Sequence, residues 1–517
     1  MQQPLQNVQS KLKANLTSPK YRSNAPRGNR FPIIPANVSS NFTLEMIYPR
    51  PDTDTHSSAR HRVNYPGQPY IVPVGVKGRG FPYFFELVDA PEGMTIGAFL
   101  DFDGLSWVRR PNYGVVTWYK PVAGTYTFTI RATNTWGEVV SVTTTLVVNT
   151  NWNILNTKLA SNGSGTMNSP YNTLASINNN KPTLVMDECI VDLDQRPGNM
   201  SGMTRTWVSE YGKRAVLLQA ASVVTCDQDD VYFGGFWFGM HKSRIGVAQL
   251  LKVTTRNRFT LFDNLISYRG ANFNGGAVPD CSVFQFDAAS GILGNASQYL
   301  LIHSNTFNGV NNRSLFNGYN VRSSVFEANT LIANTDTSGL AQGFWFKDYC
   351  SGITFRDNKQ LGDLNTQSAL TIDNPSALGV GTDFDVSYNH LRCFASVGSN
   401  PNGLGAIKLY NQNATGDSNR FIYRNTVYTP TSSPIYAAGS GNSEVAHSLS
   451  NALYYNQYSL DNNLISQVGV KLASGYSPTL DNTGSIAGLY ANNYIDSNGK
   501  FIGIHSTNRG VAGSEIA

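Results

Sequence analysis

Four short segments alternate apolar residues with polar or aromatic ones and could place chemically useful side chains on a common face. They are Val283–Asp287, Phe344–Lys347, Leu370–Asp373 and Ile407–Tyr410. Apolar residues at every second position indicate half-buried strands, so the other side chains would point outward. Stacking the segments predicts two outward columns: Gln285, Trp345, Thr371 and Lys408 in the first, and Asp287, Lys347, Asp373 and Tyr410 in the second.

Two carboxylates of the second column, Asp287 and Asp373, are the candidate catalytic groups. We expect them two coils apart, and because stacked strands are ~4.8 Å apart, about 10 Å would separate them. That lies near the upper end of the range of ~6.5–9.5 Å between the acid and base of inverting glycosidases. The candidate glycan-binding residues, whose aromatic members could stack on sugar rings, are Trp345, Lys347, Lys408 and Tyr410. The alternative interpretation is a solvated strand face with incidental acids.

Other chemistries have weaker signals. Acidic residues gather at Asp187, Glu188, Asp192 and Asp194, and again at Asp227, Asp229 and Asp230. Calcium takes roughly 6–8 oxygen ligands, but no motif with fixed ligand spacing is present, so we predict no metal site. His56 and His61 stand in a polar loop and are discounted as metal ligands.

The chain has no nucleophile elbow, Walker loop, HExxH or dinucleotide-binding motif. We therefore predict no cofactor and favour a protein that is not an enzyme.

Residues 248–500 repeat one pattern: an apolar residue, two residues, Asn, one residue and a second apolar residue. The asparagines of the copies are Asn264, Asn305, Asn329, Asn358, Asn389, Asn425, Asn463 and Asn493, which are 24 to 41 residues apart. In one copy Gln360 replaces the second apolar residue. Such repetition predicts an all-β fold, a right-handed parallel β-helix whose coils stack into one core. We expect each Asn to occupy a left-handed turn and to join a hydrogen-bonded ladder. A large antiparallel β-sandwich is the alternative.

The composition agrees with a long β surface. The chain has 517 residues, of which 41% are hydrophobic and only 14% charged, whereas helical surfaces are richer in Lys and Glu. The five cysteines are widely spaced and form no CxxC pair, which favours free buried thiols and folding in a reducing compartment. No stretch approaches the ~18 consecutive apolar residues of a membrane span. The N-terminus is polar, so we predict no signal peptide.

Residues 1–40 predict an extended arm. The segment contains five prolines and no amphipathic period, and it carries six basic residues before the first acidic residue, Glu45. These candidate anchoring residues are Lys11, Lys13, Lys20, Arg22, Arg27 and Arg30. We expect the arm to lie along an acidic partner protein; a merely solvated tail is the alternative. Nucleic-acid binding fits poorly, because no folded basic face accompanies the arm.

Residues 41–150 predict short alternating strands. Phe85 and Leu87 precede the turn at 90–94, and Trp118 precedes the alternating run at 124–128. This stretch resembles the Ig-like (cadherin-like) modules of bacterial surface and phage proteins, which implies a β-sandwich that spaces or docks. Residues 151–168 are rich in Gly, Ser and Asn and predict a linker. Ser169-Pro170 would then begin a short helix that caps a β-helix over 169–517.

A short helix after Ser169, a first strand region at 183–191 and the coil pattern follow one another in residues 169–500, and this order resembles the pectate-lyase-like β-helix superfamily, including the tailspikes of tailed bacteriophages. The resemblance rests on the coil pattern and not on a catalytic motif. It implies a homotrimeric virion protein, made in the host cytoplasm, that other virion proteins hold by its N-terminal part. The β-helix would bind a host-surface glycan. Two alternatives stay open, a polysaccharide depolymerase (hydrolase or lyase) and a purely architectural capsid-decoration or collar protein; none involves nucleic acid or membrane insertion.

Overall fold

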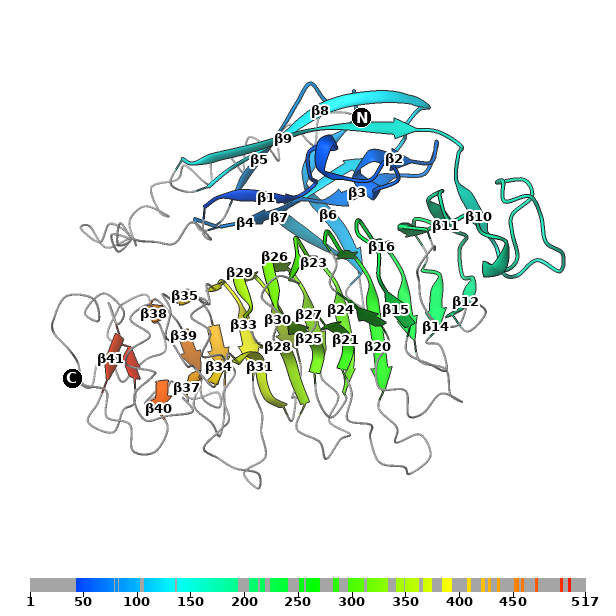
Figure 1. The fold of residues 1–517 in the computed structure, drawn as a ribbon. Helices are drawn as coiled ribbons and strands as arrows, with labels where there is room; N and C mark the ends of the chain where they lie inside the picture. The colour runs from blue at the N-terminus through cyan, green and yellow to red at the C-terminus, as the bar shows by residue number, and fades with distance from the viewer. Residues whose placement is uncertain are drawn as a thin grey trace, which may run out of the picture. The chain divides into compact units, whose positions relative to one another are not determined.

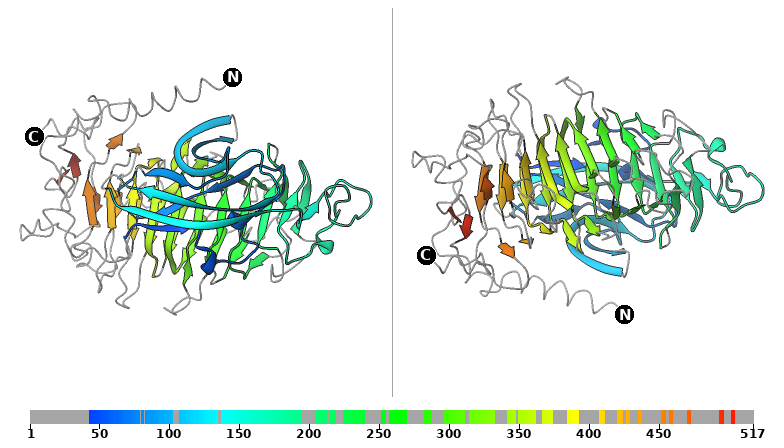
Figure 2. Two further views of the ribbon diagram at one scale, coloured as in Figure 1. Left: turned by 90° about the horizontal axis from the view of Figure 1, so that it is seen from above. Right: turned by 90° about the horizontal axis from the view of Figure 1, so that it is seen from below.

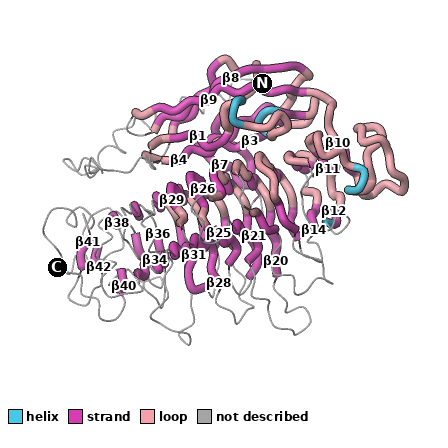
Figure 3. Tube along the Cα trace, viewed as in Figure 1, coloured by secondary structure: helices cyan, strands magenta, loops and turns pink. Residues whose placement is uncertain are grey.

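The computed structural model describes residues 43–193 with short gaps, residues 204–392 with longer gaps, and isolated strands between 407 and 503 (Figure 1). The predicted arm at 1–40, with its six basic residues, lies outside the described residues. Nearly all of the described regular structure is β-strand, and the helices are single 3-10 turns (Figure 3). None of these helices could cross a membrane.

Residues 153–472 form a parallel β-helix of three sheets, as the repeats predict (Figure 2). Sheet 1 runs through β10 (Asn153–Leu155), β11 (Thr183–Val185), β13 (Thr206–Ser209), β16 (Tyr232–Gly234), β19 (Thr260–Phe262), β23 (Leu301–His303), β26 (Val321–Glu327), β29 (Ser351–Arg356), β32 (Phe384–Ser387), β35 (Arg420–Tyr423) and β38 (Asn451–Tyr454), with β22 (Ser297–Gln298) beside β26. Sheet 2 runs through β12 (Ile190–Asp192), β14 (Val216–Leu218), β17 (Trp237–Gly239), β20 (Leu265–Arg269), β24 (Thr306–Val310), β27 (Thr330–Ile332), β30 (Lys359–Leu361), β33 (His390–Arg392), β36 (Thr426–Tyr428) and β39 (Gln457–Ser459).

Sheet 3 contains the segments with the candidate site residues. It runs through β15 (Val224–Cys226), β18 (Leu251–Val253), β21 (Ser282–Asp287), β25 (Ser314–Tyr319), β28 (Ala341–Lys347), β31 (Thr366–Asp373), β34 (Ile407–Tyr410), β37 (Ile435–Ala437) and β40 (Val470–Leu472). The last repeat departs from the prediction: β41 (Asn493–Ile495) pairs antiparallel with β42 (Phe501–Gly503). The copy around Asn493 therefore adds no parallel coil.

Stacked aromatic rings fill the inside of the coils. Phe316, Phe326, Phe344 and Phe346 are all buried, and the Phe316 and Phe326 ring centroids are 4.8 Å apart in an edge-to-face arrangement. Such pairs add to the hydrophobic stabilisation of a core. Cys189, Cys226 and Cys350 are buried thiols that form no disulfide within the described residues, as predicted; Cys281 and Cys393 lie outside the described residues.

The predicted asparagine ladder is present between sheets 1 and 2. The Nδ2 atom of Asn264 donates to Oδ1 of Asn305, and the contact repeats from Asn305 to Asn329, from Asn329 to Asn358 and from Asn358 to Asn389, at 2.9 to 3.1 Å. Each Nδ2 also donates to a backbone carbonyl, as from Asn329 to Ile302 at 2.8 Å. All five amides are buried, so the ladder satisfies polar groups that water cannot reach.

One detail of the ladder was predicted wrongly. The left-handed residue is the one before each Asn, with a φ of 54° at Asp263, 55° at Ser304, 59° at Ala328, 50° at Asp357 and 57° at Tyr388. The turn thus does not use the tolerance of Asn for positive φ. Asn is needed because its amide can donate and accept at the same time.

The N-terminal domain consists of small sheets. A four-stranded sheet is ordered β2 (Val63–Asn64), β9 (Val139–Val148), β8 (Gly124–Thr133) and β5 (Phe84–Val88), and a three-stranded sheet is ordered β3 (Tyr70–Pro73), β7 (Trp107–Trp118) and β6 (Thr95–Phe102). The pair β1 (Glu45–Tyr48) and β4 (Gly75–Lys77) and the turns η2 (Asp52–Asp54) and η3 (Arg60–Arg62) complete it. The predicted strands are therefore present, and membership of an Ig-like family stays a prediction.

The N-terminal domain packs on the outer face of sheet 1. Tyr232, Phe262, Leu301 and Val325 point out of the coils yet are buried, because they share one core cluster with the domain. The packing is close at Gly75, where an added Cβ atom would lie 2.8 Å from Leu301 Cδ1. The two parts are thus joined by an apolar core.

The predicted linker and capping helix differ from the structure. β10 lies inside the predicted linker and pairs in parallel with β11, so the β-helix begins before residue 169. The helix expected after Ser169 is one 3-10 turn, η4 (Leu174–Ser176), capped by the Thr173 hydroxyl. Leu174 is nevertheless fully buried in the core of the β-helix, and the capping role of this segment stays a prediction.

Candidate functional site

The predicted outward columns are in the expected register. Trp345 of β28 pairs with Thr371 of β31, and Lys347 pairs with Asp373. The next step pairs Thr371 with Lys408 and Asp373 with Tyr410. Three of the four predicted segments, in β28, β31 and β34, are therefore neighbouring strands of sheet 3, with candidate glycan-binding positions in β28 and β34 on either side of β31.

The spacing of the two candidate catalytic residues was predicted wrongly, because β25 lies between β21 and β28. Asp287 pairs with Tyr319, Tyr319 with Lys347, and Lys347 with Asp373. Three steps of ~4.8 Å separate the backbones of the two aspartates by about 14 Å. This exceeds the ~6.5–9.5 Å of inverting glycosidases and argues against direct cooperation of Asp287 and Asp373.

The strand β25 was missed because a glycine interrupts its alternation. Gly318 occupies an inward position, where an added Cβ atom would lie 2.9 Å from both the Phe316 ring and Val321 Cγ2. The aromatic ring of Phe316 fills the space that a second apolar side chain would occupy. One indication of this strand was still present in the sequence. Phe316 is an apolar residue at the inward position two residues before Gly318, and Asn317 and Tyr319 are polar or aromatic residues at the outward positions.

The outward face of β25 and β28 carries a compact cluster of Tyr319, Trp345 and Lys347. The Lys347 ammonium lies 3.2 Å from the centroid of the Trp345 ring and 3.2 Å from the Tyr319 hydroxyl. All three side chains are half buried, whereas Asn317 of β25 and Thr371 of the neighbouring β31 are buried. The cation occupies one face of the indole, so the exposed parts offer a ring edge, a hydroxyl and an ammonium.

The remaining predicted residues are placed only by their backbones. Asp287, Asp373, Lys408 and Tyr410 each end or lie in a strand of sheet 3, but their side chains lie outside the described residues. The structure therefore brings together Trp345 and Lys347 of the predicted set and adds Tyr319, which the sequence reasoning missed.

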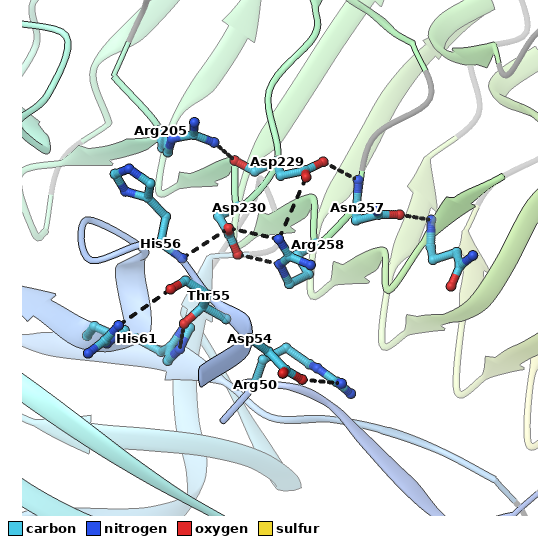
Figure 4. A network of polar contacts seen from close by, with 12 residues as sticks. Arg50, Asp54, Thr55, His56, His61, Arg205, Asp229, Asp230, Asn257 and Arg258 are labelled. Carbon is cyan, nitrogen blue, oxygen red and sulfur yellow. Dashed lines mark hydrogen bonds and ion pairs between the residues drawn. The ribbon is translucent and has the colours of Figure 1, made fainter. Parts of the chain in front are cut away.

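Two of the acidic residues considered for calcium, Asp229 and Asp230, instead contact arginines at the joint with the N-terminal domain (Figure 4). Asp230 accepts from Arg258 Nε at 2.7 Å and Nη2 at 3.1 Å, and from the backbone amide of His56 at 3.1 Å. Burial opposes the charge of Arg258, but the hydrogen bonds and charge of Asp230 raise its pKa above the ordinary value. Asp229 accepts from the backbone amide of Asn257 at 2.8 Å. These carboxylates are thus already satisfied.

The two histidines of this joint are held as neutral groups. Burial lowers the pKa of His61 to about 3, and burial followed by the charge of Arg205 lowers that of His56. His61 Nε2 lies 3.4 Å from the Thr55 hydroxyl. In the described part of the chain, no three His, Cys, Asp or Glu side chains gather closely enough to hold a metal ion.

Comparisons with known proteins return distant likenesses in structure. No family model and no curated protein matches the sequence. A solved family 28 exopolygalacturonase from Yersinia enterocolitica aligns over 80% of this chain and 98% of its own, at 11% identity and a TM-score of 0.35. A putative alpha-galactosidase from Bacteroides fragilis aligns over 52% of this chain and 53% of its own, at 11% identity and a TM-score of 0.17. Similarities of this size assign the chain to no family. The structure shows an all-β protein built on a parallel β-helix.

Proposed function

We propose that this protein is a virion appendage of a tailed bacteriophage, held by its N-terminal part, whose β-helix attaches to a host-surface glycan. The observation that carries the glycan proposal is the cluster of Tyr319, Trp345 and Lys347 on the outward face of sheet 3. A ring edge beside an ammonium and a phenol supplies apolar contact and hydrogen-bond donors at one place. Sugars need both, because their rings carry C–H faces as well as hydroxyls.

The columns on either side of this cluster support binding of a polymer. Lys408 and Tyr410 continue the same two columns beyond Thr371 and Asp373. Successive coils repeat every ~4.8 Å, so a polysaccharide that extends along the sheet from Trp345 and Lys347 would reach the strand positions of Lys408 and Tyr410 two coils further on. Several weak contacts with one polysaccharide chain together give a higher overall affinity than any single contact.

A depolymerase is the weaker alternative. Its two proposed catalytic aspartates are three coils apart, which exceeds the carboxylate spacing of inverting glycosidases. The homotrimer, the attachment of the arm at 1–40 to other virion proteins, and the location in a virion belong to the proposal and are supported by the sequence pattern alone.

The experiment is a binding measurement of the full chain with capsule and lipopolysaccharide purified from candidate host strains. Trp345→Ala should weaken binding by about tenfold, since an aromatic contact contributes roughly 0.5–1.5 kcal/mol. Phe84→Ala is the matched control, because Phe84 is an aromatic residue that is 52% exposed on the N-terminal domain. Equal binding by both variants would refute the proposed face, and an architectural role would then be favoured.

Release of new reducing ends or unsaturated sugars during the same incubation would instead establish a depolymerase. Light scattering of the purified chain measures the oligomeric state, for which we expect three copies.

A further inference from the structure

A cleft of about 450 Å³ lies between the N-terminal domain and the first coils of the β-helix. One wall comes from the loop after β2, including Tyr65 and Gln68, and the other from sheets 1 and 2, including Tyr211 and Trp237. Its volume is within the range of ~300–1,000 Å³ typical of small-molecule sites. The cleft shares no residue with the cluster of Tyr319, Trp345 and Lys347.

Two aromatic side chains at the cleft are left open to solvent. Trp237 is 43% exposed and Tyr211 is 44% exposed. Trp237 points outward because Phe238, the next residue of β17, is buried inside the coil. The Tyr211 ring lies edge-on to Tyr119 of the N-terminal domain, with 6.1 Å between centroids. Their exposed surfaces are available for stacking with the apolar face of a ligand.

The polar groups beside these rings favour hydrogen-bond donors. Glu210 accepts from the backbone amide of Asp187 at 2.9 Å, and Glu188 lies 3.3 Å from the Lys158 ammonium. An ionised carboxylate has about four lone-pair positions, so each can accept further bonds. Burial raises the pKa of Tyr211 to about 12, which keeps its hydroxyl protonated at neutral pH.

The cleft is poorly suited to an anionic ligand. Its partly exposed cation, Arg214, is bound by the Asp263 carboxylate at 2.8 Å, and Glu188 and Glu210 would repel a phosphate or a carboxylate. A purely apolar ligand would cover polar carboxylate oxygens while supplying no hydrogen-bond donor to them. The ligand that meets every group is one with flat C–H faces for the rings and several hydroxyls for the carboxylates.

We propose that this cleft binds a short, uncharged saccharide that stacks on Trp237 and donates hydroxyl groups to Glu188 and Glu210. The site differs from the attachment face of sheet 3 in place and in the size of its ligand, which the walls limit to a few rings. Because both walls contribute, a bound saccharide would also hold the N-terminal domain against the coils.

The test is calorimetric titration and tryptophan fluorescence of the full chain with lactose, maltose, cellobiose and N,N′-diacetylchitobiose. At least one of these should bind, and Trp237→Ala should weaken it by about tenfold, whereas Trp237→Phe should retain most of the affinity. Glu210→Gln should weaken binding further than Glu138→Gln, a matched change of a carboxylate outside the cleft. Trp345→Ala should leave this binding unchanged, which separates the cleft from the attachment face.

Three results would overturn the proposal. The first is the absence of binding by all four disaccharides to a chain that still folds, as judged by its circular dichroism. The second is binding that Trp237→Ala does not weaken. The third is tighter binding of 3′-sialyllactose or spermidine than of any neutral sugar, which would show that charge, and not stacking with hydroxyl donation, selects the ligand.

Discussion

The buried ion pair between Arg356 and Glu327 joins two coils of the β-helix beneath the N-terminal domain and should contribute strongly to stability. The two side chains lie on adjacent coils of sheet 1, 2.7 Å apart and only 0% and 2% exposed. A second guanidinium nitrogen donates to the Tyr83 hydroxyl of the domain at 2.6 Å. Burial opposes the charge of Arg356, but the Glu327 carboxylate raises its pKa above the ordinary value, so the pair stays ionised.

Replacing Arg356 with Met would leave the Glu327 carboxylate buried without its partner. Breaking a buried pair in this way costs about 3–5 kcal/mol, whereas removing both charges with apolar residues is often neutral. We therefore expect Arg356→Met to lower the free energy of unfolding by that amount. The double variant with Glu327→Leu should recover most of the loss.

Hydrogen exchange of the β26 and β29 amides is the suitable measurement, because it reports local opening without requiring reversible unfolding of a 517-residue chain. The matched control is Arg131→Met. Arg131 and Glu86 form an ion pair of similar length, 2.8 Å, but their side chains are 42% and 60% exposed. A solvated pair contributes only about 0–1 kcal/mol.

Equal protection in Arg356→Met and Arg131→Met would refute the reasoning, since it would show that burial does not strengthen this pair. A double variant no more stable than Arg356→Met would also contradict it, because the loss would then come from packing and not from the stranded carboxylate.

Three further predictions concern stability. Asn329→Ala removes an amide that both donates and accepts in the ladder. It should lower the free energy of unfolding by about 2–4 kcal/mol, because its buried partners lose their hydrogen bonds. In urea unfolding, the control Asn180→Ala, at an exposed position, should change the midpoint little. Gly75→Ala should destabilise by about 1–3 kcal/mol through overpacking against Leu301, and Leu301→Ala in the same chain should relieve the clash; thermal unfolding of the single and double variants checks this. His61 has a folded pKa of about 3 and an ordinary unfolded one, so between these values the unfolded chain binds more protons and stability should fall on acidification. The slope should be up to about 1.4 kcal/mol per pH unit, and His61→Gln should flatten it; an unchanged slope would show that another group titrates.

Local patterns in the sequence were sufficient for the strands and for their register. Alternation at Phe344–Lys347 and Leu370–Asp373 identified the strands, and the side-chain period of two fixed which residues face outward. The number of coils between Asp287 and Asp373 was predicted wrongly, because Gly318 at an inward position of β25 breaks the alternation of apolar residues. The structure shows why a glycine stands there: the Phe316 ring fills the space that a side chain would occupy.

The sequence by itself determined the parallel coils and the asparagine ladder, because each repeat must bury the same inner face against the next. Only the tertiary structure decided what covers the outer face of sheet 1. Leu301 and Phe262 read as parts of continuous apolar runs, which show burial on both sides but not the partner. The N-terminal domain is that partner, and residues far apart in sequence, such as Tyr65 and Trp237, become opposite walls of one cleft only because this apolar packing brings the domain onto the coils.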